Sequence, residues 1–378
     1  MQPSLRPVLA AALALCSYLA SAHEPETSES IESLQPIGLV GARDDTVSVS
    51  VQPLDIAPSG TPPVFGAGTT VQAANADFLR ARLMLVAPSP VAGVNAVVLD
   101  GSGGVVDEIA LDGPAGVREF WTKLVPGSWM RVEVRGTQQP ASTSLVVRDV
   151  YRSQPLSDVL SIVGADGRRR VTTLTDAPLK SLARSTARLV FEKNGLMYTC
   201  TAFLVGPKRM MTNQHCIGAA STCASSVVMF DYDTLAVVPA ANQRRCTRIL
   251  ASDYVLDYTS FELDAAPDAA IRPLEVEARP LAAAEKTIIV QHPGGEPKQV
   301  SIDGCGVIEP IAAGRGRRTD FTHGCDTLGG SSGSAVLSSA GRVIGLHHLG
   351  RGGQYPDYNR GVRIELVLED MRRKGAPL

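Results

Sequence analysis

The feature that most constrains the fold is a succession of short segments in which apolar and polar residues alternate. In LRARLMLV, for example, Leu79, Ala81, Leu83 and Leu85 share one face. Successive side chains of a β-strand point to opposite sides, so this alternation predicts half-buried strands rather than helices. Such segments follow one another from 46 to 152, separated by Gly, Pro, Ser and Asp. This spacing is typical of a β-sandwich.

The alternation returns at residue 187 and continues almost to the C-terminus, with Asn194-Gly195 as a hairpin turn signal. Only the last segment changes period, because its apolar residues follow the i, i+3, i+4, i+7 spacing of a helix. These residues are Ile364, Val367, Leu368 and Met371. A chain of 378 residues has room for two domains. The sequence therefore predicts an all-β protein, with a β-sandwich over 23–152 and a second β domain over 187–378 that ends in a helix.

The first predicted domain contains no histidine between 46 and 152, and no catalytic constellation. It could serve as a pro-segment, a ligand-binding module or a packing accessory. Residues 153–186 connect it to the second domain. The GRRRV motif within this connector is either a processing region or a solvated basic loop.

The N-terminus has the features of a secretory signal. A positively charged start is followed by the short apolar run VLAAALALCSYLA and by the A-x-A pattern Ala20-Ser21-Ala22. We therefore interpret residues 1–22 as a signal peptide that is removed from a secreted protein, extracellular or periplasmic. A lipoprotein signal at Cys16 is disfavoured, because Leu15 stands where a small residue is expected. After signal removal, no other stretch is long and apolar enough to span a membrane.

Six of the seven cysteines lie beyond residue 199, and the seventh leaves with the signal. An even number in an exported protein predicts three disulfides. Pairing between sequence neighbours is the simplest arrangement, although the sequence alone leaves others open. The six residues are Cys200, Cys216, Cys223, Cys246, Cys305 and Cys325.

The formal net charge of −2 gives no reason to expect nucleic acid or an anionic membrane as a partner.

Three residues of the second domain have the types needed for hydrolysis by a serine nucleophile. His215 lies in MTNQHC after a predicted strand, Asp257 opens LDYTSFEL, and Ser332 lies in the glycine-rich GGSSGSAV. Such chemistry needs a hydroxyl, a base within hydrogen-bond reach, a carboxylate that orients the base, and N–H donors for the oxyanion.

The order and context of these motifs resemble the chymotrypsin-fold serine proteases, in particular their bacterial trypsin-like and glutamyl endopeptidase branch. The motifs are CTAFLV, MTNQHC, LDYTSFEL, QHPGG, CDTLGGSSGSAV and VIGLHH, within 187–378. The resemblance implies two six-stranded β-barrels with the active site between them. It also implies that His215 is the general base, Asp257 its orienting carboxylate and Ser332 the nucleophile, with the amides of Gly330 and Ser332 as the oxyanion hole.

The same resemblance implies that Cys200 bonds to Cys216 beside the histidine, and it suggests that Cys305 bonds to Cys325. We expect no cofactor and no metal. We expect a monomer that acts on polypeptide substrates, bound as an added strand near Gly345–Gly350.

Each assignment has a competitor. Ser331 satisfies G-x-S-x-G, but that motif belongs to a fold that needs an acid and then a histidine after the serine. Asp253 is the rival of Asp257. We expect His292 to stabilise a turn, and His348 to be a strand residue that faces solvent or the core. Adjacent histidines on a strand point to opposite faces, so His347 and His348 do not suggest a metal site.

Cleavage specificity stays open between a glutamyl-type pocket, a pocket for Arg or Lys, and an apolar or broad preference. Asp326, six residues before Ser332, stands where trypsin-like enzymes carry the aspartate that pairs with Arg or Lys. Thr327 and His347 stand where glutamyl endopeptidases bind a substrate carboxylate. One pocket cannot present Asp326 and also accept glutamate, because like charges repel. A glutamyl-type pocket, with Asp326 turned away, is slightly favoured.

The sequence thus predicts a secreted serine endopeptidase. A catalytically inactive binding protein on the same fold and an esterase with the same triad are the alternatives. The residue before the nucleophile is Ser331 and not an aspartate. Activation by an α-amino group that is freed by cleavage and pairs with an aspartate at this position is therefore not available.

Overall fold

The computed structural model describes residues 38–45, 48–53, 64–136, 143–153, 160–162, 165–234, 238–352 and 357–378. The predicted signal peptide, 1–22, lies outside the described residues, and so does part of the predicted connector.

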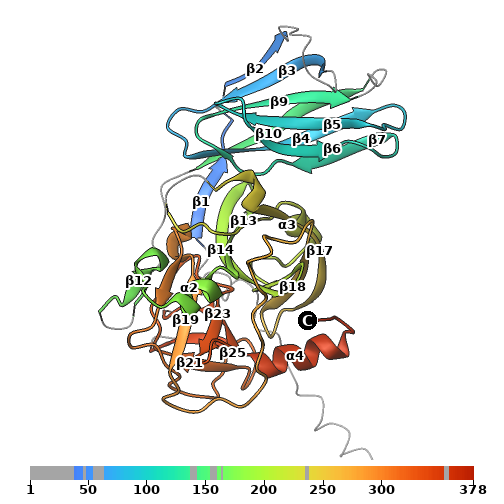
Figure 1. Cartoon of the computed structure of the whole chain (residues 1–378). Coiled ribbons are helices and arrows are strands. Elements are labelled where there is room, and N and C mark those ends of the chain that lie inside the picture. Colours follow the sequence, from blue (N-terminus) through green and yellow to red (C-terminus); the bar gives the residue numbers. More distant parts are fainter. Residues whose placement is uncertain are drawn as a thin grey trace, which may run out of the picture. The chain divides into compact units, whose positions relative to one another are not determined.

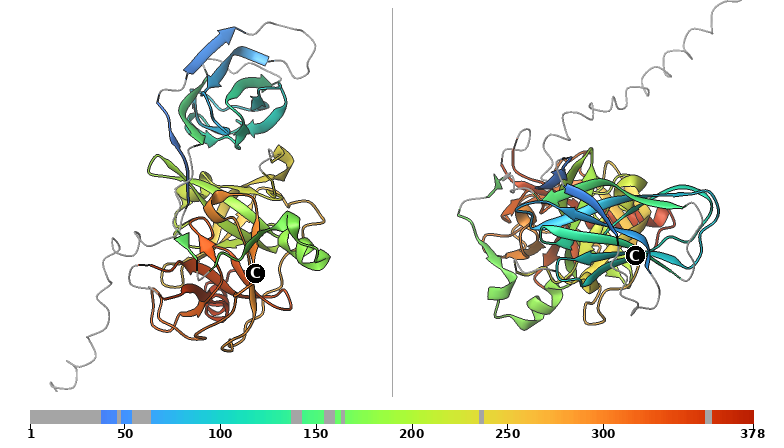
Figure 2. Two further views of the ribbon diagram at one scale, coloured as in Figure 1. Left: turned by 90° about the vertical axis from the view of Figure 1, so that its left-hand side faces the viewer. Right: turned by 90° about the horizontal axis from the view of Figure 1, so that it is seen from above.

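The N-terminal strands form the two layers of a β-sandwich, which Figure 1 shows in blue to green and Figure 2 shows from two further directions. One layer has the order β2-β3-β9-β5-β6, and the other contains β1-β10-β4-β7, with β8 paired to β4. The strands are β1 (Gly38–Arg43), β2 (Ser48–Pro53), β3 (Val64–Gln72), β4 (Phe78–Ala87), β5 (Val94–Asp100), β6 (Val105–Ala110), β7 (Gly116–Trp121), β8 (Val125–Pro126), β9 (Trp129–Gly136) and β10 (Ser144–Ser153).

The alternation in the sequence accounts for the core between these layers. Leu79, Ala81, Leu83 and Leu85 of β4 are all buried, as their shared face predicts. They pack with residues of β5 and β9 in one apolar cluster. The predicted β-sandwich is therefore present.

The connector has regular structure of its own. It contains β11 (Leu160–Ser161), β12 (Arg168–Arg170), the short 3₁₀ helix η1 (Val171–Thr173) and α2 (Ala177–Ala183). Asp176 caps α2 by accepting a hydrogen bond from the amide of Leu179. The GRRRV motif is therefore not only a solvated loop, because its three arginines form β12, which pairs with β20 of the second domain.

The second domain begins with a closed barrel of six strands. Around the barrel the neighbours are β13-β14-β15-β18-β17-β16, and β16 returns to β13. Its elements are β13 (Thr186–Lys193), β14 (Leu196–Gly206), β15 (Arg209–Thr212), α3 (Ala220–Ala224), β16 (Val227–Met229), η2 (Ala240–Asn242), β17 (Gln243–Asp253) and β18 (Tyr258–Leu263). Asn194 and Gly195 both have positive φ, as their hairpin signal predicts.

The remaining strands form a half-barrel with the order β20-β19-β23-β24-β25-β21, extended at the edge of β20 by β12. The elements are β19 (Thr287–Gln291), η3 (Pro293–Gly295), β20 (Gln299–Ser301), β21 (Asp320–His323), β22 (Thr327–Leu328), β23 (Ala335–Ser338), β24 (Val343–Leu349), β25 (Asn359–Arg363) and α4 (Ile364–Arg373). The double-barrel expectation is confirmed in type, although this second barrel is not closed. The connector strand occupies the edge of β20 that closure would need.

Helix α4 ends the chain as predicted, with Ile364, Val367, Leu368 and Met371 buried on one face. Among the helices that the structure describes, none is long and apolar enough to cross a membrane.

Candidate active site

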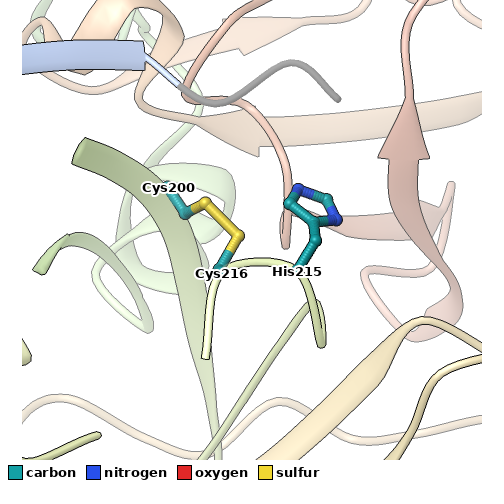
Figure 3. Close-up of side chains that lie close together, drawn as sticks. All are labelled: Cys200, His215 and Cys216. Atoms are coloured by element: carbon teal, nitrogen blue, oxygen red, sulfur yellow. A yellow bond between two sulfur atoms is a disulfide. The ribbon is translucent and has the colours of Figure 1, made fainter. Parts of the chain in front are cut away.

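His215 lies in the loop that follows β15, and a disulfide fixes this loop. Cys216, the next residue, is bonded to Cys200 of β14 with an S–S distance of 2.03 Å (Figure 3). The base candidate is therefore tied to the wall of the first barrel. The other two disulfides, Cys223–Cys246 and Cys305–Cys325, also join sequence neighbours.

Cys200, His215 and Cys216 lie close enough together for their ligand atoms to surround a metal ion. Their chemistry does not fit one, because the two sulfur atoms are bonded to each other and a metal site needs thiolates. The group is better explained as a disulfide beside a histidine.

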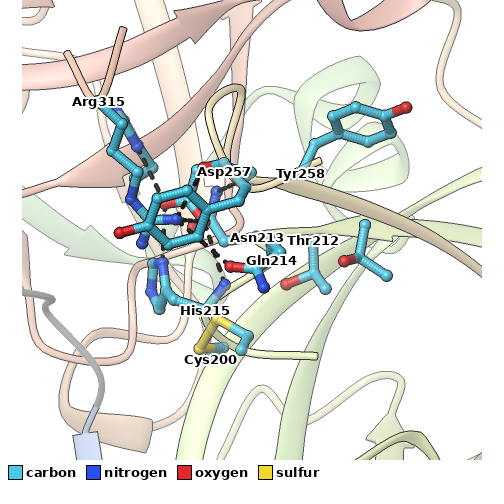
Figure 4. A network of polar contacts seen from close by, with 12 residues as sticks. Cys200, Thr212, Asn213, Gln214, His215, Asp257, Tyr258 and Arg315 are labelled. Atoms are coloured by element: carbon cyan, nitrogen blue, oxygen red, sulfur yellow. Dashed lines mark hydrogen bonds and ion pairs between the residues drawn. A yellow bond between two sulfur atoms is a disulfide. The ribbon is translucent and has the colours of Figure 1, made fainter. Parts of the chain in front are cut away.

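Asp257 lies in the tight turn between β17 and β18, with a φ of 42°. Its carboxylate orients the loop of His215 through two hydrogen bonds (Figure 4). Nδ1 of His215 donates to Oδ2 at 2.9 Å, and the backbone amide of His215 donates to Oδ1 at 3.1 Å. The rival Asp253 is engaged elsewhere, since it accepts from the amide of Leu256 and from Lys374 after α4. The geometry therefore favours Asp257 over Asp253.

Ser332 lies in a turn whose backbone requires glycine on both sides. Gly330 and Gly333 have φ values of 98° and 85°. A Cβ atom at Gly333 would also collide with the carbonyl oxygen of Thr201. The turn is thus a fixed backbone, not a flexible linker.

Strand β14 holds this turn through the backbone carbonyl groups of Gly330 and Ser332. The amide of Thr201 donates to the carbonyl of Ser332 at 2.8 Å, and its hydroxyl donates to the carbonyl of Gly330 at 2.9 Å. Thr201 directly follows Cys200, whose disulfide holds the loop of His215. One strand therefore anchors both the serine turn and the histidine loop.

The rival serine has a structural role in the same turn. The hydroxyl of Ser331 accepts a hydrogen bond from the amide of Leu328 at 3.1 Å. This contact closes the turn and gives the hydroxyl of Ser331 a structural role.

The three specificity candidates have different surroundings. The carboxylate of Asp326 accepts a hydrogen bond from the amide of Gly167, in the connector, at 2.8 Å. In contrast, the hydroxyl of Thr327 and Nε2 of His347 are buried and make no hydrogen bond with the residues that the structure describes. Nδ1 of His347 lies 3.1 Å from Nε2 of His323.

Comparison with known proteins agrees with this arrangement. Residues 200–346 match the family described as the trypsin-like peptidase domain. The chain therefore contains a trypsin-like peptidase domain.

Three individual proteins are similar to parts of this chain. The chain is 26% identical over 229 residues to the secreted RxLR effector protein 73 of Plasmopara viticola, covering 57% of this chain and 56% of that protein. It is 29% identical over 168 residues to the uncharacterized protein y4fB of Sinorhizobium fredii, covering 40% and 25%. The chain thus spans about half or less of the length of these curated relatives. A solved Glu endopeptidase shares 18% identity with a TM-score of 0.44, covering 56% of this chain and 98% of that structure.

Two further residues of the peptidase domain, Arg315 and His348, also contact Asp257. Nη1 of Arg315 lies 3.2 Å from Oδ1, and Nδ1 of His348 donates to Oδ2 at 3.0 Å. His348 is a buried strand residue, as one of the two expected alternatives has it, and it is in addition a partner of this carboxylate. No local sequence signal identifies Arg315, which lies in an irregular segment more than fifty residues away from Asp257.

These contacts set the charges in the peptidase domain's site. Burial opposes the ionised form of Asp257, but His215, Arg315 and His348 together hold its pKa well below the ordinary value. The pKa of His215 is lowered, mainly by burial and further by Arg315 and His348, while Asp257 acts in the opposite direction. Asp257 is therefore an anion and His215 a neutral base near neutral pH.

His292 has the turn-stabilising role that we expect from its motif. Its Nδ1 bonds to the carbonyl oxygen of Glu296 at 3.0 Å, which closes the turn around η3. That turn packs against the nucleophile loop, since the amide of Gly294 donates to the carbonyl of Gly329.

Proposed function

We propose that the protein is a secreted serine endopeptidase in which Ser332 is the nucleophile, His215 the general base and Asp257 the residue that orients the base. The observation that carries this proposal is the hydrogen bond between Nδ1 of His215 and Asp257. It fixes the tautomer so that Nε2 is the nitrogen left to accept a proton. Nε2 is buried and makes no hydrogen bond with the described residues.

The reaction then follows from these roles. Nε2 of His215 takes the proton of Ser332 as Oγ attacks the scissile carbonyl carbon, and the amides of Gly330 and Ser332 stabilise the oxyanion. The histidine passes its proton to the leaving amine, which departs as the acyl-enzyme forms. Water, deprotonated by the same nitrogen, hydrolyses the ester and restores Ser332.

Secretion is supported by the disulfides as well as by the predicted signal. Three bridges within one peptidase domain are expected in an oxidising compartment and not in a reducing cytosol. We therefore place the mature enzyme outside the cytoplasm.

We further propose that the enzyme cleaves after glutamate. Thr327 and His347 are the residues that the resemblance assigns to binding a substrate carboxylate. Each has a buried polar atom without a hydrogen bond to the described residues, so a bound carboxylate would satisfy both. The Asp326 carboxylate, which would favour Arg or Lys instead, is already bonded to the connector at Gly167.

The test uses purified protein without its signal, before and after limited proteolysis, because Ser332 is fully buried in this chain and His215 is 7% exposed. A denatured protein mixture is digested and the cut sites are read by mass spectrometry. The variants are Ser332→Ala and, as the matched control from the same turn, Ser331→Ala.

We expect cuts after Glu, lost by at least about 10³-fold in Ser332→Ala, and substantial activity in Ser331→Ala. Equal activity of Ser332→Ala and the unmodified protein would refute the nucleophile assignment. Cuts after Arg or Lys would move the specificity to Asp326. Hydrolysis of simple esters without any peptide cleavage would indicate an esterase, and no turnover after limited proteolysis would indicate an inactive binding protein.

A further inference from the structure

His348 is placed between two buried carboxylates. Its Nδ1 donates to Oδ2 of Asp257 at 3.0 Å, and its Nε2 donates to Oδ2 of Asp320 at 2.6 Å. All three side chains are completely buried. A neutral imidazole has only one N–H group, so it can satisfy one of these acceptors but not both. With both carboxylates ionised, the geometry therefore requires a proton on each ring nitrogen.

Asp320 is held in place for this contact. Its Oδ1 accepts a hydrogen bond from the hydroxyl of Thr319 at 2.7 Å. The backbone of Gly314 approaches so closely that a Cβ at this position would overlap the carboxylate. Strand β21 thus presents Asp320 in one fixed orientation, towards His348 of β24.

The charges of this cluster balance only when His348 is a cation. Asp257 and Asp320 are two buried carboxylates, and Arg315 contributes one positive charge at Oδ1 of Asp257. A buried carboxylate without a charged partner is costly, so a second cation is expected beside Asp320. His348 is the group in contact with both carboxylates.

We propose that His348, fixed by Asp320, is a positioning residue of the peptidase site: a constant imidazolium that holds Asp257 in its anionic form and in the orientation that His215 needs. The catalytic consequence of this inference rests on the proposed function. The protonation of His348 does not, because it follows from the contacts with Asp257 and Asp320 alone.

The environment of His348 supports a constant charge. Burial alone would lower its pKa, but Asp320 and Asp257 raise it to about 9. The other titratable groups near it are His215, Arg315, His323 and His347. Arg315 is already a cation, and burial lowers the pKa of each of these histidines. Near neutral pH, His348 is therefore the charged histidine of this group.

The charge also affects the catalytic base. Nδ1 of His215 and Nδ1 of His348 both bond to the same oxygen, Oδ2 of Asp257, at 2.9 and 3.0 Å. A cation this close opposes protonation of His215, so the base stays neutral at lower pH. Above the pKa of His348, the ring keeps its shorter bond to Asp320. Its bare Nδ1 then faces Asp257, which disturbs the carboxylate that orients the base.

The first experiment observes the proton directly. Protein labelled with ¹⁵N-histidine is titrated from pH 5 to 10, and long-range ¹H–¹⁵N spectra report the protonation of each ring. His348→Gln identifies the signal of residue 348. We expect both nitrogens of His348 to be protonated from pH 5 to about 9, and we expect Asp320→Asn to lower this midpoint by on the order of one pH unit or more. A neutral His348 ring at pH 7 overturns the proposal, whether or not the protein is an enzyme.

The second experiment measures kcat/KM against pH for the variants. His348→Asn keeps an N–H group near the position of Nδ1 but has no charge, so it separates the charge from the hydrogen bond. We expect its acid limb to shift upward by on the order of one pH unit. In Asp320→Asn, we expect the alkaline limb to move down together with the NMR midpoint.

The outcomes separate this inference from the proposed function. A purely structural role would lower activity in both variants without moving either limb, and that result overturns the proposal. Protonation of His348 in a protein without any peptidase activity would refute the proposed function and leave the charged cluster established. If His348→Asn does not fold, the titration of the unmodified protein and of Asp320→Asn still decides.

Discussion

Replacing His348 by Gln should change how the stability of the protein depends on pH between 6.5 and 9. In the folded protein the pKa of His348 is raised to about 9, against an ordinary value of 6.5. A group with a raised pKa in the folded state contributes stability that is fully present below its unfolded pKa. That stability is lost as the pH rises through the folded pKa. The unmodified protein should therefore become less stable from pH 6.5 to pH 9.

The size of this loss follows from the two pKa values. Since one pH unit corresponds to about 1.4 kcal/mol, the difference amounts to roughly 3 kcal/mol of unfolding free energy. The buried histidines with lowered pKa values, such as His292, make stability depend on pH in the acidic range instead. Their stability contribution is present above pH 6.5 and is lost as the pH falls below it, so they add no slope between 6.5 and 9.

The assay is urea unfolding with disulfides intact, measured at intervals from pH 5 to pH 10. We expect the unmodified protein to lose about 3 kcal/mol between 6.5 and 9, and His348→Gln to lose far less over the same range. The matched control is His292→Gln, because His292 is also buried but lies outside the cluster of Asp257 and Asp320. His292→Gln should still lose stability between pH 6.5 and 9, but it should lose less stability than the unmodified protein as the pH falls below 6.5. Identical slopes for the unmodified protein and His348→Gln above pH 6.5 would refute the reasoning.

Three other changes have effects that the contacts predict. Gly333→Ala should lower stability by about 2 kcal/mol or more through positive φ and backbone overlap, and should abolish turnover. Gly127→Ala, at a similar φ but in open space, should cost less in the same thermal melts, and equal costs would contradict this account. Replacing Cys200 and Cys216 together by serine should lower stability by about 3 kcal/mol and reduce kcat, so an unchanged urea midpoint would count against the disulfide's role. Arg245 of β17 forms an ion pair with the buried Asp107 of β6. Arg245→Ala leaves this carboxylate without its cation, at a cost of roughly 2 kcal/mol, and should speed proteolysis of the N-terminal strands. No change in the rate would exclude a role of this ion pair in holding β6 against β17.

Much of the fold could be predicted because the chain repeats one simple pattern. Alternation places one face of β4 in the core, and the helical spacing after Arg363 places one face of α4 against the second barrel. The same holds for the tight turn at Asn194-Gly195, where the residue types themselves favour positive φ. Each of these features depends on neighbours in the sequence.

The inner part of the site could not be predicted in this way. Asp320 carries no sequence signal and His348 reads as an ordinary strand residue. Their contact depends on the pairing of β21 and β24 with β25, which lies between them. The orientation of Asp326 was equally hidden, since its partner Gly167 lies in a connector about 160 residues earlier. Contacts between distant strands carry no local signature, whereas a catalytic motif does.

The connector and β1 give the N-terminal half two separate links to the peptidase domain. Strand β1 is hydrogen-bonded to β10 of the sandwich on one edge and to β14 on the other, so it joins both domains into one continuous sheet. The connector contacts the segment just before the turn of Ser332, where β11 pairs with β22 and the amide of Gly167 donates to Asp326. A cut within the GRRRV motif would release the second link, and with it the constraint on Asp326 and Thr327, but it would leave the sheet through β1 intact. For the proposed peptidase, these contacts favour activation by local rearrangement of the connector, with the sandwich still attached, over activation by release of the whole N-terminal domain.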